Sequence, residues 1–291
     1  MSFTLSTDRS CDIFCSDLDS RGIKYISQVY TIDEVAYEDD FDKDEDYKGF
    51  YDLIRAGKMP TTSQINIAEH EEFFERVLNE CGGDLLHITL SSGLSSTYQS
   101  AVTAAQNVNE RLGVTRVYVL DSLAATSVQR LVVDEAQRLR DEGLSAAEAL
   151  KVMQDITKRV QVRFMPTDLM HLKRGGRVSG ASAYIGTALR IKPILCINKD
   201  GGLSIVSKKI GVGAGVSYMA DFFKKNNDDC TKKVYLPCAD NFEVAEELKT
   251  RVKEIRPDCD VEIGWVGPVI GAHTGAGMVG VVFISGKERD I

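Results

Sequence analysis

The chain has 291 residues, of which 43% are hydrophobic and 27% are charged, and it contains 24 glycines and 6 prolines. These proportions are typical of a globular protein and exclude a collagen-like, low-complexity or disordered chain. The formal net charge of −8 at pH 7 disfavours nonspecific binding to nucleic acid or to an anionic membrane. The length favours two domains, and no apolar run reaches the roughly 18 residues that a membrane-spanning helix needs.

The sequence carries seven cysteines at irregular spacing, and its first residues lack the basic and apolar segments of a signal peptide. We therefore expect free thiols and a cytoplasmic location. Cys11 and Cys15 stand one helical turn apart, but no second cysteine pair supplies further ligands. We therefore expect no metal site.

The first half of the chain alternates short apolar strands with amphipathic helices. In chain order we predict a helix over 68–81, a strand over 85–90, a helix over 98–112, a strand over 117–120, and helices over 127–142 and 145–158. Ser145 is a good N-cap for the last of these helices. Such alternation favours a parallel sheet with helices on its faces.

The second half of the chain has a different pattern. We predict a hairpin over 193–206 with its turn at 198–202, helices over 212–225 and 241–255, and strands over 233–236 and 277–285. The predicted fold class is α/β, with an N-terminal parallel sheet with flanking helices and a C-terminal mixed α/β domain. The expected domains are residues 1–160 and 161–291.

Charge is unevenly distributed along the sequence. The segment from Asp33 to Asp46 holds nine acidic residues and one lysine, and we expect a solvated acidic loop there. The segment from Lys173 to Lys209 holds eight basic residues and one acid. Because this basic stretch stands out in a negative chain, it is either a solvated face or a surface that meets phosphate or an acidic partner.

A segment rich in hydroxyl groups, Leu90 to Ser100, separates a predicted strand from a predicted helix. In an open α/β sheet, ligands bind at such turns beside the carboxyl ends of the strands. The free N–H groups at the start of the helix suit a carboxylate or a phosphate. The alternative is that Ser95 or Ser96 only caps the helix.

Two further polar clusters stand out. The cluster Pro60 to Gln64 precedes a helix and is by itself only a capping sequence. In the cluster Gly271 to Gly275, glycines on both sides of His273 allow a close approach of the backbone to a ligand. A lone histidine is usually structural, so His273 is a candidate ligand-binding residue rather than an established one.

The segment Gly93 to Thr97 is similar to the nucleophile elbow of serine hydrolases, although threonine replaces the final glycine. With His171 or His273 as base, a serine hydrolase or acyl transferase that uses Ser95 as nucleophile is the alternative function. No carboxylate is obviously placed to orient His273, as a catalytic triad requires.

Taken together, these segments resemble the DegV family of bacterial lipid-binding proteins. The resemblance implies a two-domain α/β fold that buries a long-chain fatty acid between its domains, without catalysis and without a cofactor. Some members of the family present the fatty acid to a separate fatty-acid kinase, so such a kinase is an expected partner. The matching blocks follow the family's order over nearly the whole chain: Thr61 to Gln64, Leu90 to Ser100, Asp121 to Ser122, Leu172 to Gly180, Ile191 to Ile194 and Gly267 to Gly280.

The resemblance also implies which residues bind the ligand. Thr62 and Ser95 resemble the hydroxyl groups that bind the fatty-acid carboxyl group, and His273 resembles the histidine close to it. Arg177 corresponds to a basic residue of the family motif. A buried carboxyl group costs several kcal/mol unless it is hydrogen-bonded, and these residue types supply donors. The other expected ligand-binding residues are Ser63, Ser92, Gly93 and Gly275.

Some positions depart from the family pattern. Ile65 stands where proline is usual, and Arg9 interrupts the usual N-terminal Asp-Ser-Thr. The acidic segment Glu38 to Asp46 looks peculiar to this chain. Ser207 to Lys209 stand where relatives that use a kinase tend to carry an arginine, so binding without a kinase stays an alternative. The sequence leaves acyl length, saturation and oligomeric state open.

Overall fold

The computed structural model describes residues 3–167, 169–178 and 191–291. In this part of the chain, a four-stranded sheet of order β2–β1–β6–β7 is parallel throughout. This confirms the predicted N-terminal parallel sheet. Its strands are β1 (Thr4–Asp8), β2 (Lys24–Ile26), β6 (Leu85–Thr89) and β7 (Val117–Asp121).

Helices cover both faces of this sheet. Leu85 and Leu86 point to opposite faces, as successive strand residues do. Leu85 packs in a cluster with α3 (Ile67–Cys81) and α4 (Thr97–Leu112), and Leu86 packs with α5 (Ser127–Asp141) and α6 (Ala146–Arg159). Ser145 caps α6 as predicted. The cap of α3 is Asn66, whose side chain accepts from the N–H of Glu69, and not the polar cluster before it.

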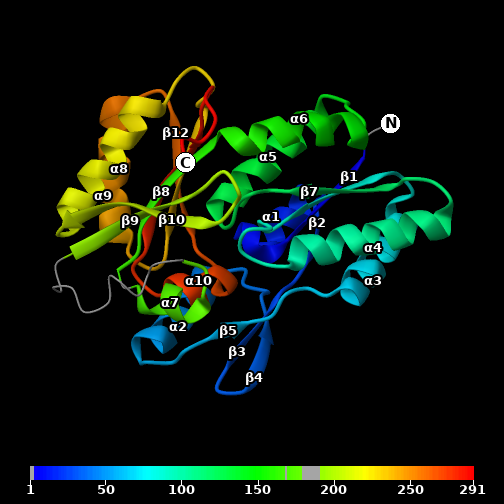
Figure 1. Ribbon diagram of the computed structural model, residues 1–291, viewed down its shortest axis with the longest axis horizontal. Helices are drawn as coiled ribbons and strands as arrows, with labels where there is room; N and C mark the ends of the chain where they lie inside the picture. Colours follow the sequence, from blue (N-terminus) through cyan, green and yellow to red (C-terminus); the bar gives the residue numbers. More distant parts are fainter. Residues whose placement is uncertain (1–2, 168, 179–190) are drawn as a thin grey trace.

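Strands from β8 onward build a second, mixed sheet of order β10–β9–β8–β13–β11–β12, at the left of Figure 1. In this sheet the pair β11–β12 is parallel, and the other strand pairs are antiparallel. The predicted hairpin over 193–206 is β9–β10, and α8 (Val212–Asn226) and α9 (Phe242–Ile255) pack on the sheet. The strands are β8 (Val160–Met165), β9 (Ile191–Ile197), β10 (Leu203–Ile210), β11 (Lys233–Cys238), β12 (Asp260–Trp265) and β13 (Val279–Ile284).

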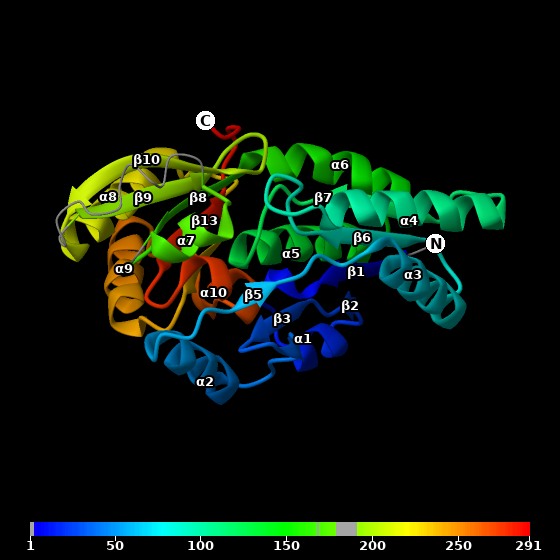
Figure 2. The same ribbon diagram turned by 60° about the horizontal axis from the view of Figure 1, so that its bottom comes forward.

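The helix α5 lies between the two sheets in Figures 1 and 2 and contacts β1 on one side and β11 and β13 on the other. The guanidinium of Arg130 on α5 lies 2.8 Å from the carboxylate of Glu262 and 4.7 Å from the ring centre of Tyr235. The hydroxyl of Tyr235 donates to Asp134 at 2.6 Å. One cluster of buried side chains extends across this contact from Leu5 to Val282.

A small antiparallel sheet of order β4–β3–β5 lies beside the two main sheets. Figures 1 and 2 show β5 next to α7 and α10, and the helix α10 contacts α7, β5 and β3. The remaining elements are η1 (Arg9–Cys11), α1 (Cys15–Ser20), β3 (Val29–Ile32), β4 (Val35–Glu38), α2 (Asp44–Arg55), β5 (Thr61–Thr62), α7 (Met170–Gly175) and α10 (Pro268–Thr274).

The expectation that Asp33 to Asp46 is solvated is correct for most of its acidic side chains, which are exposed, but the expectation of a loop is wrong. This segment contains β4 and the first turn of α2. Asp39 is only 1% exposed, and its carboxylate lies 3.6 Å from the guanidinium of the fully buried Arg9. Asp44 accepts a hydrogen bond of 2.7 Å from the indole N–H of Trp265 in β12. Arg9 therefore accounts for the burial of Asp39, whereas Asp44 stays exposed, and charge patterning along the segment does not reveal such partners.

Candidate functional site

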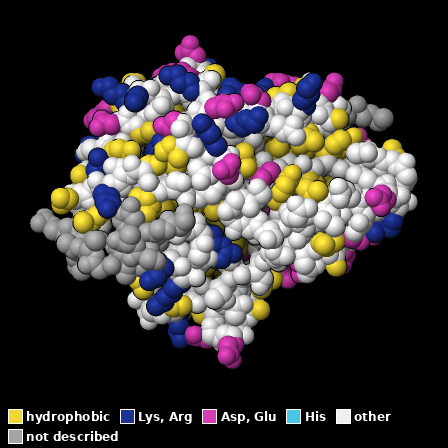
Figure 3. Space-filling view, viewed as in Figure 1, with side chains coloured by type: hydrophobic (Ala, Val, Ile, Leu, Met, Phe, Trp, Pro, Cys, Tyr) yellow, Lys and Arg dark blue, Asp and Glu magenta, His cyan; other side chains and the backbone are white. Residues whose placement is uncertain are grey.

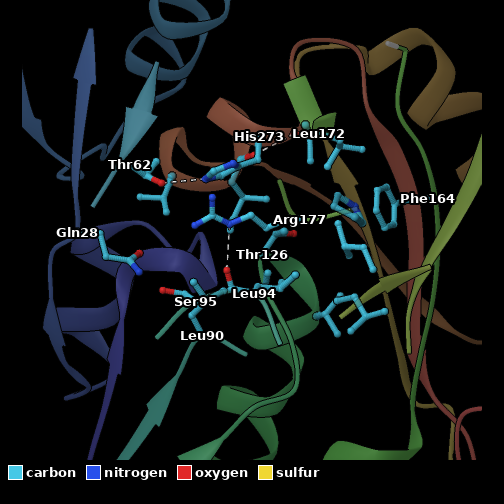
Figure 4. A pocket seen from close by; sticks show the side chains of 18 of the residues that line it. Gln28, Thr62, Leu90, Leu94, Ser95, Thr126, Phe164, Leu172, Arg177 and His273 are labelled. Carbon is cyan, nitrogen blue, oxygen red and sulfur yellow. Dashed lines mark hydrogen bonds between the residues drawn. The ribbon is translucent and has the colours of Figure 1, made fainter. Parts of the chain in front are cut away.

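A cavity of about 420 Å³ lies between the carboxyl ends of β6 and β7 and the second sheet. Its volume is within the roughly 300–1,000 Å³ that is usual for ligand sites. Figure 4 shows polar side chains gathered on one side of this space and apolar side chains on the other. The apolar lining comes from both halves of the chain and includes Val128, Val162, Phe164, Leu172, Ile197 and Met278.

The structure brings Thr62, Ser95, Arg177 and His273 together in the lining of this cavity. Thr62 lies on the short strand β5, where it pairs with Tyr30 of β3. Ser95 lies in the turn between β6 and α4, and His273 lies in the last turn of α10. The hydroxyl of Thr62 and Nε2 of His273 are 2.9 Å apart.

Burial lowers the pKa of His273 to about 4, and the nearby charges of Arg177 and His171 act in the same direction. The imidazole is therefore neutral at pH 7, with one ring nitrogen as donor and the other as acceptor. Because His273 is neutral, Arg177 is the charged side chain of the lining as far as the described residues show.

The hydroxyl of Ser95 is paired with Thr97 rather than with a histidine. Its Oγ lies 2.9 Å from Oγ1 of Thr97 and accepts from the Thr97 N–H at 3.2 Å. Within the described residues, His273 forms its side-chain hydrogen bond with Thr62, and no carboxylate binds it. The geometry thus lacks the serine–histidine–carboxylate relay that the hydrolase alternative requires.

The capping alternative for this turn is partly correct. Ser96 is the N-cap residue of α4, but its side chain makes no capping hydrogen bond. Ser95 binds the Thr97 N–H in the first turn of the helix and also lines the cavity. Ser95 therefore helps to start α4 while its hydroxyl remains at the cavity wall.

The other predicted residues divide into two groups. Ser63 and Ser92 line the cavity, whereas Gly93 and Gly275 are not part of its lining. A Cβ atom on Gly93 would lie 2.5 Å from the backbone of the β9–β10 turn, and one on Gly275, whose φ is +70°, would lie 2.6 Å from the ring of His171. In this structure the two glycines allow close packing within the protein.

Arg177 crosses the polar side of the cavity. Its Nε donates to the carbonyl of Leu94 at 3.2 Å, and Nη1 donates to the carbonyl of Gly175. Residues 179–190 of the predicted basic stretch lie outside the described residues. They include Ser179 and Gly180, the last two residues of the family block Leu172 to Gly180. Lys173 and Arg174 are exposed on α7, where Figure 3 shows a group of basic side chains.

Two polar residues of the lining, Thr126 and Gln28, lie outside the polar segments that the sequence analysis singled out. Thr126 follows β7, and the rule that ligands bind beyond the carboxyl ends of parallel strands applies to it as it does to Ser95. Gln28 stands between β2 and β3 in no recognisable motif, so no local signal marks it.

The described residues contain no cluster of three or more His, Cys, Asp or Glu side chains that could hold a metal ion. All seven cysteines are free thiols. No helix in the described part of the chain is both long and apolar enough to cross a bilayer.

Comparison with known proteins assigns the chain to a family. Residues 2–286 match the family model described as "Uncharacterised protein, DegV family". The chain belongs to the DegV family. The DegV domain-containing protein YteA of Lactococcus lactis is 33% identical over 290 residues, which cover 100% of both chains. The resemblance inferred from the sequence is therefore confirmed.

Two solved DegV structures share the fold. A DegV family protein from Thermus thermophilus that binds fatty acid is 27% identical, with a TM-score of 0.86 over 98% of this chain and 100% of its own. DegV of Bacillus subtilis, a fatty acid binding protein, is 26% identical, with a TM-score of 0.83 over 98% of this chain and 99% of its own.

Proposed function

We propose that this DegV family protein binds a long-chain fatty acid in the cavity, with the acyl chain between the predicted domains 1–160 and 161–291. The observation that carries the proposal is one cavity with an apolar lining from both halves of the chain and a polar side formed by hydroxyl groups and Arg177. The two solved relatives that bind fatty acid support it.

In this proposal Thr62 and Ser95 donate hydrogen bonds to the carboxylate, and His273 lies beside it. Ser63 and Ser92 add hydroxyl groups to the same lining. Removing a carboxylate from water costs several kcal/mol unless it is hydrogen-bonded or paired with a charge. Arg177 provides that charge, while the neutral His273 holds Thr62 in place.

The first test is native mass spectrometry of the purified protein, followed by extraction of the bound molecule. We expect about one equivalent of a C14–C18 fatty acid. The delipidated protein should also take up hexadecanoic acid in a titration. If the purified protein contains no bound fatty acid and takes up no C14–C18 fatty acid in the titration, the proposal is contradicted.

The second test removes one hydroxyl group from the polar side. Ser95→Ala should weaken hexadecanoic acid binding by about 1 to 3 kcal/mol, because a buried carboxylate oxygen loses a donor. Thr103→Ala is the matched control, since it removes a half-buried hydroxyl on α4 that binds the Gln99 carbonyl and does not line the cavity. Equal affinities for wild type and Ser95→Ala would exclude Ser95 as a ligand residue. Covalent labelling of Ser95 by a fluorophosphonate would instead favour the hydrolase alternative.

The proposal extends to a fatty-acid kinase as partner. Lys173 and Arg174 are exposed on α7, next in sequence to Arg177, so the polar side of the cavity has a basic edge. A basic edge suits the acidic surface or nucleotide phosphates of a kinase, and such contacts weaken as salt rises. Reversal of both charges, Lys173→Glu with Arg174→Glu, should abolish salt-sensitive association while the fatty acid still binds. Unchanged phosphorylation of the bound acid would remove α7 as the docking surface.

A further inference from the structure

Gln28 has a buried side chain whose amide oxygen has no hydrogen-bond partner among the described residues. The residue is 1% exposed, and no hydrogen bond to its side chain forms within the described residues. Its Oε1 atom is shut off from solvent. More than 90% of buried polar groups in proteins find a partner, so this amide is an exception that calls for an explanation.

The amide faces the cavity at its polar side. Gln28 belongs to the lining, and in Figure 4 its amide points into the space between Thr62 and Ser95. The backbone is held there from two sides, since the N–H of Asp39 donates to the Gln28 carbonyl at 2.9 Å and the N–H of Ser63 donates to the Val29 carbonyl at 3.1 Å. Gln28 is therefore fixed beside the place proposed for the carboxyl group.

A carboxylate alone does not satisfy this amide. The side chain of glutamine offers two N–H donors and one carbonyl acceptor. A carboxylate only accepts hydrogen bonds, and Thr62, Ser95 and Arg177 already surround it with donors. Whichever way the amide is turned, its oxygen needs a donor that an unsubstituted fatty-acid anion does not have.

We propose that Gln28 selects fatty acids that carry a hydroxyl group close to the carboxylate, on the second or third carbon atom. The hydroxyl donates to the amide oxygen of Gln28 and accepts from its N–H group, so both ends of the amide are satisfied. This inference rests on the proposed function, because it assigns the class of fatty acid that the same cavity prefers.

The test compares three ligands on the delipidated full-length protein: hexadecanoic acid, 2-hydroxyhexadecanoic acid and 3-hydroxyhexadecanoic acid. We expect at least one hydroxy acid to bind the wild type about tenfold more tightly than hexadecanoic acid. Gln28→Leu keeps the size of the side chain and should bring the ratio of affinities to about one. Thr103→Ala should retain the wild-type ratio.

Thermal unfolding of the ligand-free proteins provides a second readout. Gln28→Leu removes an unpaired buried amide and should therefore raise the Tm. The inference is overturned if the wild type prefers hexadecanoic acid to both hydroxy acids, or if Gln28→Leu leaves the ratio unchanged. Failure of the wild type to bind any of the three acids would instead refute the proposed function, so the two failures are distinguishable.

Discussion

The hydroxyl of Thr62 and Nε2 of His273 are 2.9 Å apart, although 211 residues separate them in the sequence. The contact joins β5 to α10 at the polar side of the cavity. Because His273 is neutral at pH 7, its Nε2 either accepts a hydrogen bond from the Thr62 hydroxyl or donates one to it, depending on the tautomer. If Nε2 carries the proton, the Thr62 hydroxyl remains free to donate to a ligand.

Thr62→Val should weaken hexadecanoic acid binding by roughly tenfold, since valine has the shape of threonine without its hydroxyl group. Thr62→Ser restores the hydroxyl and should bind close to wild type. Thr61→Val is the matched control, because Thr61 is exposed on the same strand outside the cavity. Titration calorimetry gives the affinities, and an unchanged value for Thr62→Val would exclude Thr62 from the binding site.

The buried Asp39, which lies beside Arg9, should make the stability of the fold depend on pH. Burial raises the pKa of Asp39 to about 7, and the charge of Arg9 opposes that rise. Asp39→Asn removes the counter-charge of Arg9, but it also removes a carboxylate whose raised pKa makes its ionised form less favourable in the folded than in the unfolded state. Urea denaturation measures the free energy of unfolding.

At pH 5.5, well below the folded-state pKa of Asp39, the carboxyl group of the wild type is mostly neutral. Because an unfolded aspartate titrates near 3.9, the folded wild type binds more protons than the unfolded chain in this range, and its stability falls as the pH rises. Asp39→Asn lacks this group, so its free energy of unfolding relative to wild type should be higher at pH 8 than at pH 5.5, by up to about 2 kcal/mol. Asp52→Asn, at an exposed position on α2, is the control and should change stability little at either pH. Equal effects of Asp39→Asn at the two pH values would show that Asp39 keeps its charge throughout this range.

His70 should make the protein less stable in acid. Burial lowers its pKa to about 4, whereas an unfolded histidine titrates near 6.5. The unfolded state therefore binds more protons between these values, and stability falls by up to about 1.4 kcal/mol per pH unit as the pH drops. His70→Phe removes this group and should gain stability relative to wild type as the pH falls from 7 to 5.

The comparison with wild type is needed because other buried groups titrate in the same range. His87, 5.5 Å from His70 between ring centres, also has a pKa well below its usual value because of burial. Asp39 acts in the opposite direction, since its raised pKa favours folding at low pH. The contribution of His70 is therefore measured by the difference in free energy of unfolding between wild type and His70→Phe. A difference that stays constant from pH 7 to pH 5 would show that His70 titrates normally in the folded protein.

Gly93→Ala should destabilise the protein by about 1 to 3 kcal/mol and weaken ligand binding. The new Cβ atom would lie 2.5 Å from backbone atoms of Gly201 and Gly202, which have little room to move. The hydroxyl of Ser91 also binds the Gly201 carbonyl at 2.9 Å, so a shift there displaces the turn that carries Ser95. As a control, Gly49→Ala meets nothing within 4 Å on α2 and should stabilise the helix.

The sequence by itself determined the regular elements whose residues carry a local signal. The strand over 85–90 and the helix over 98–112 correspond to β6 and α4. They could be predicted because a run of apolar residues indicates a buried strand and apolar residues at helical spacing indicate an amphipathic helix. The turn over 198–202 and the cap at Ser145 followed from side-chain chemistry at single positions. The three polar clusters were also recognised locally.

Only the tertiary structure decided which of these groups meet and which polar side chains are buried. Thr62 and His273 are 211 residues apart, and their contact depends on how β5 and α10 pack. Asp39 is drawn inward by Arg9, and Gln28 turns into the cavity without any motif to mark it. The local sequence does not predict such positions, because a buried polar group depends on a hydrogen-bond partner elsewhere in the chain or in the ligand.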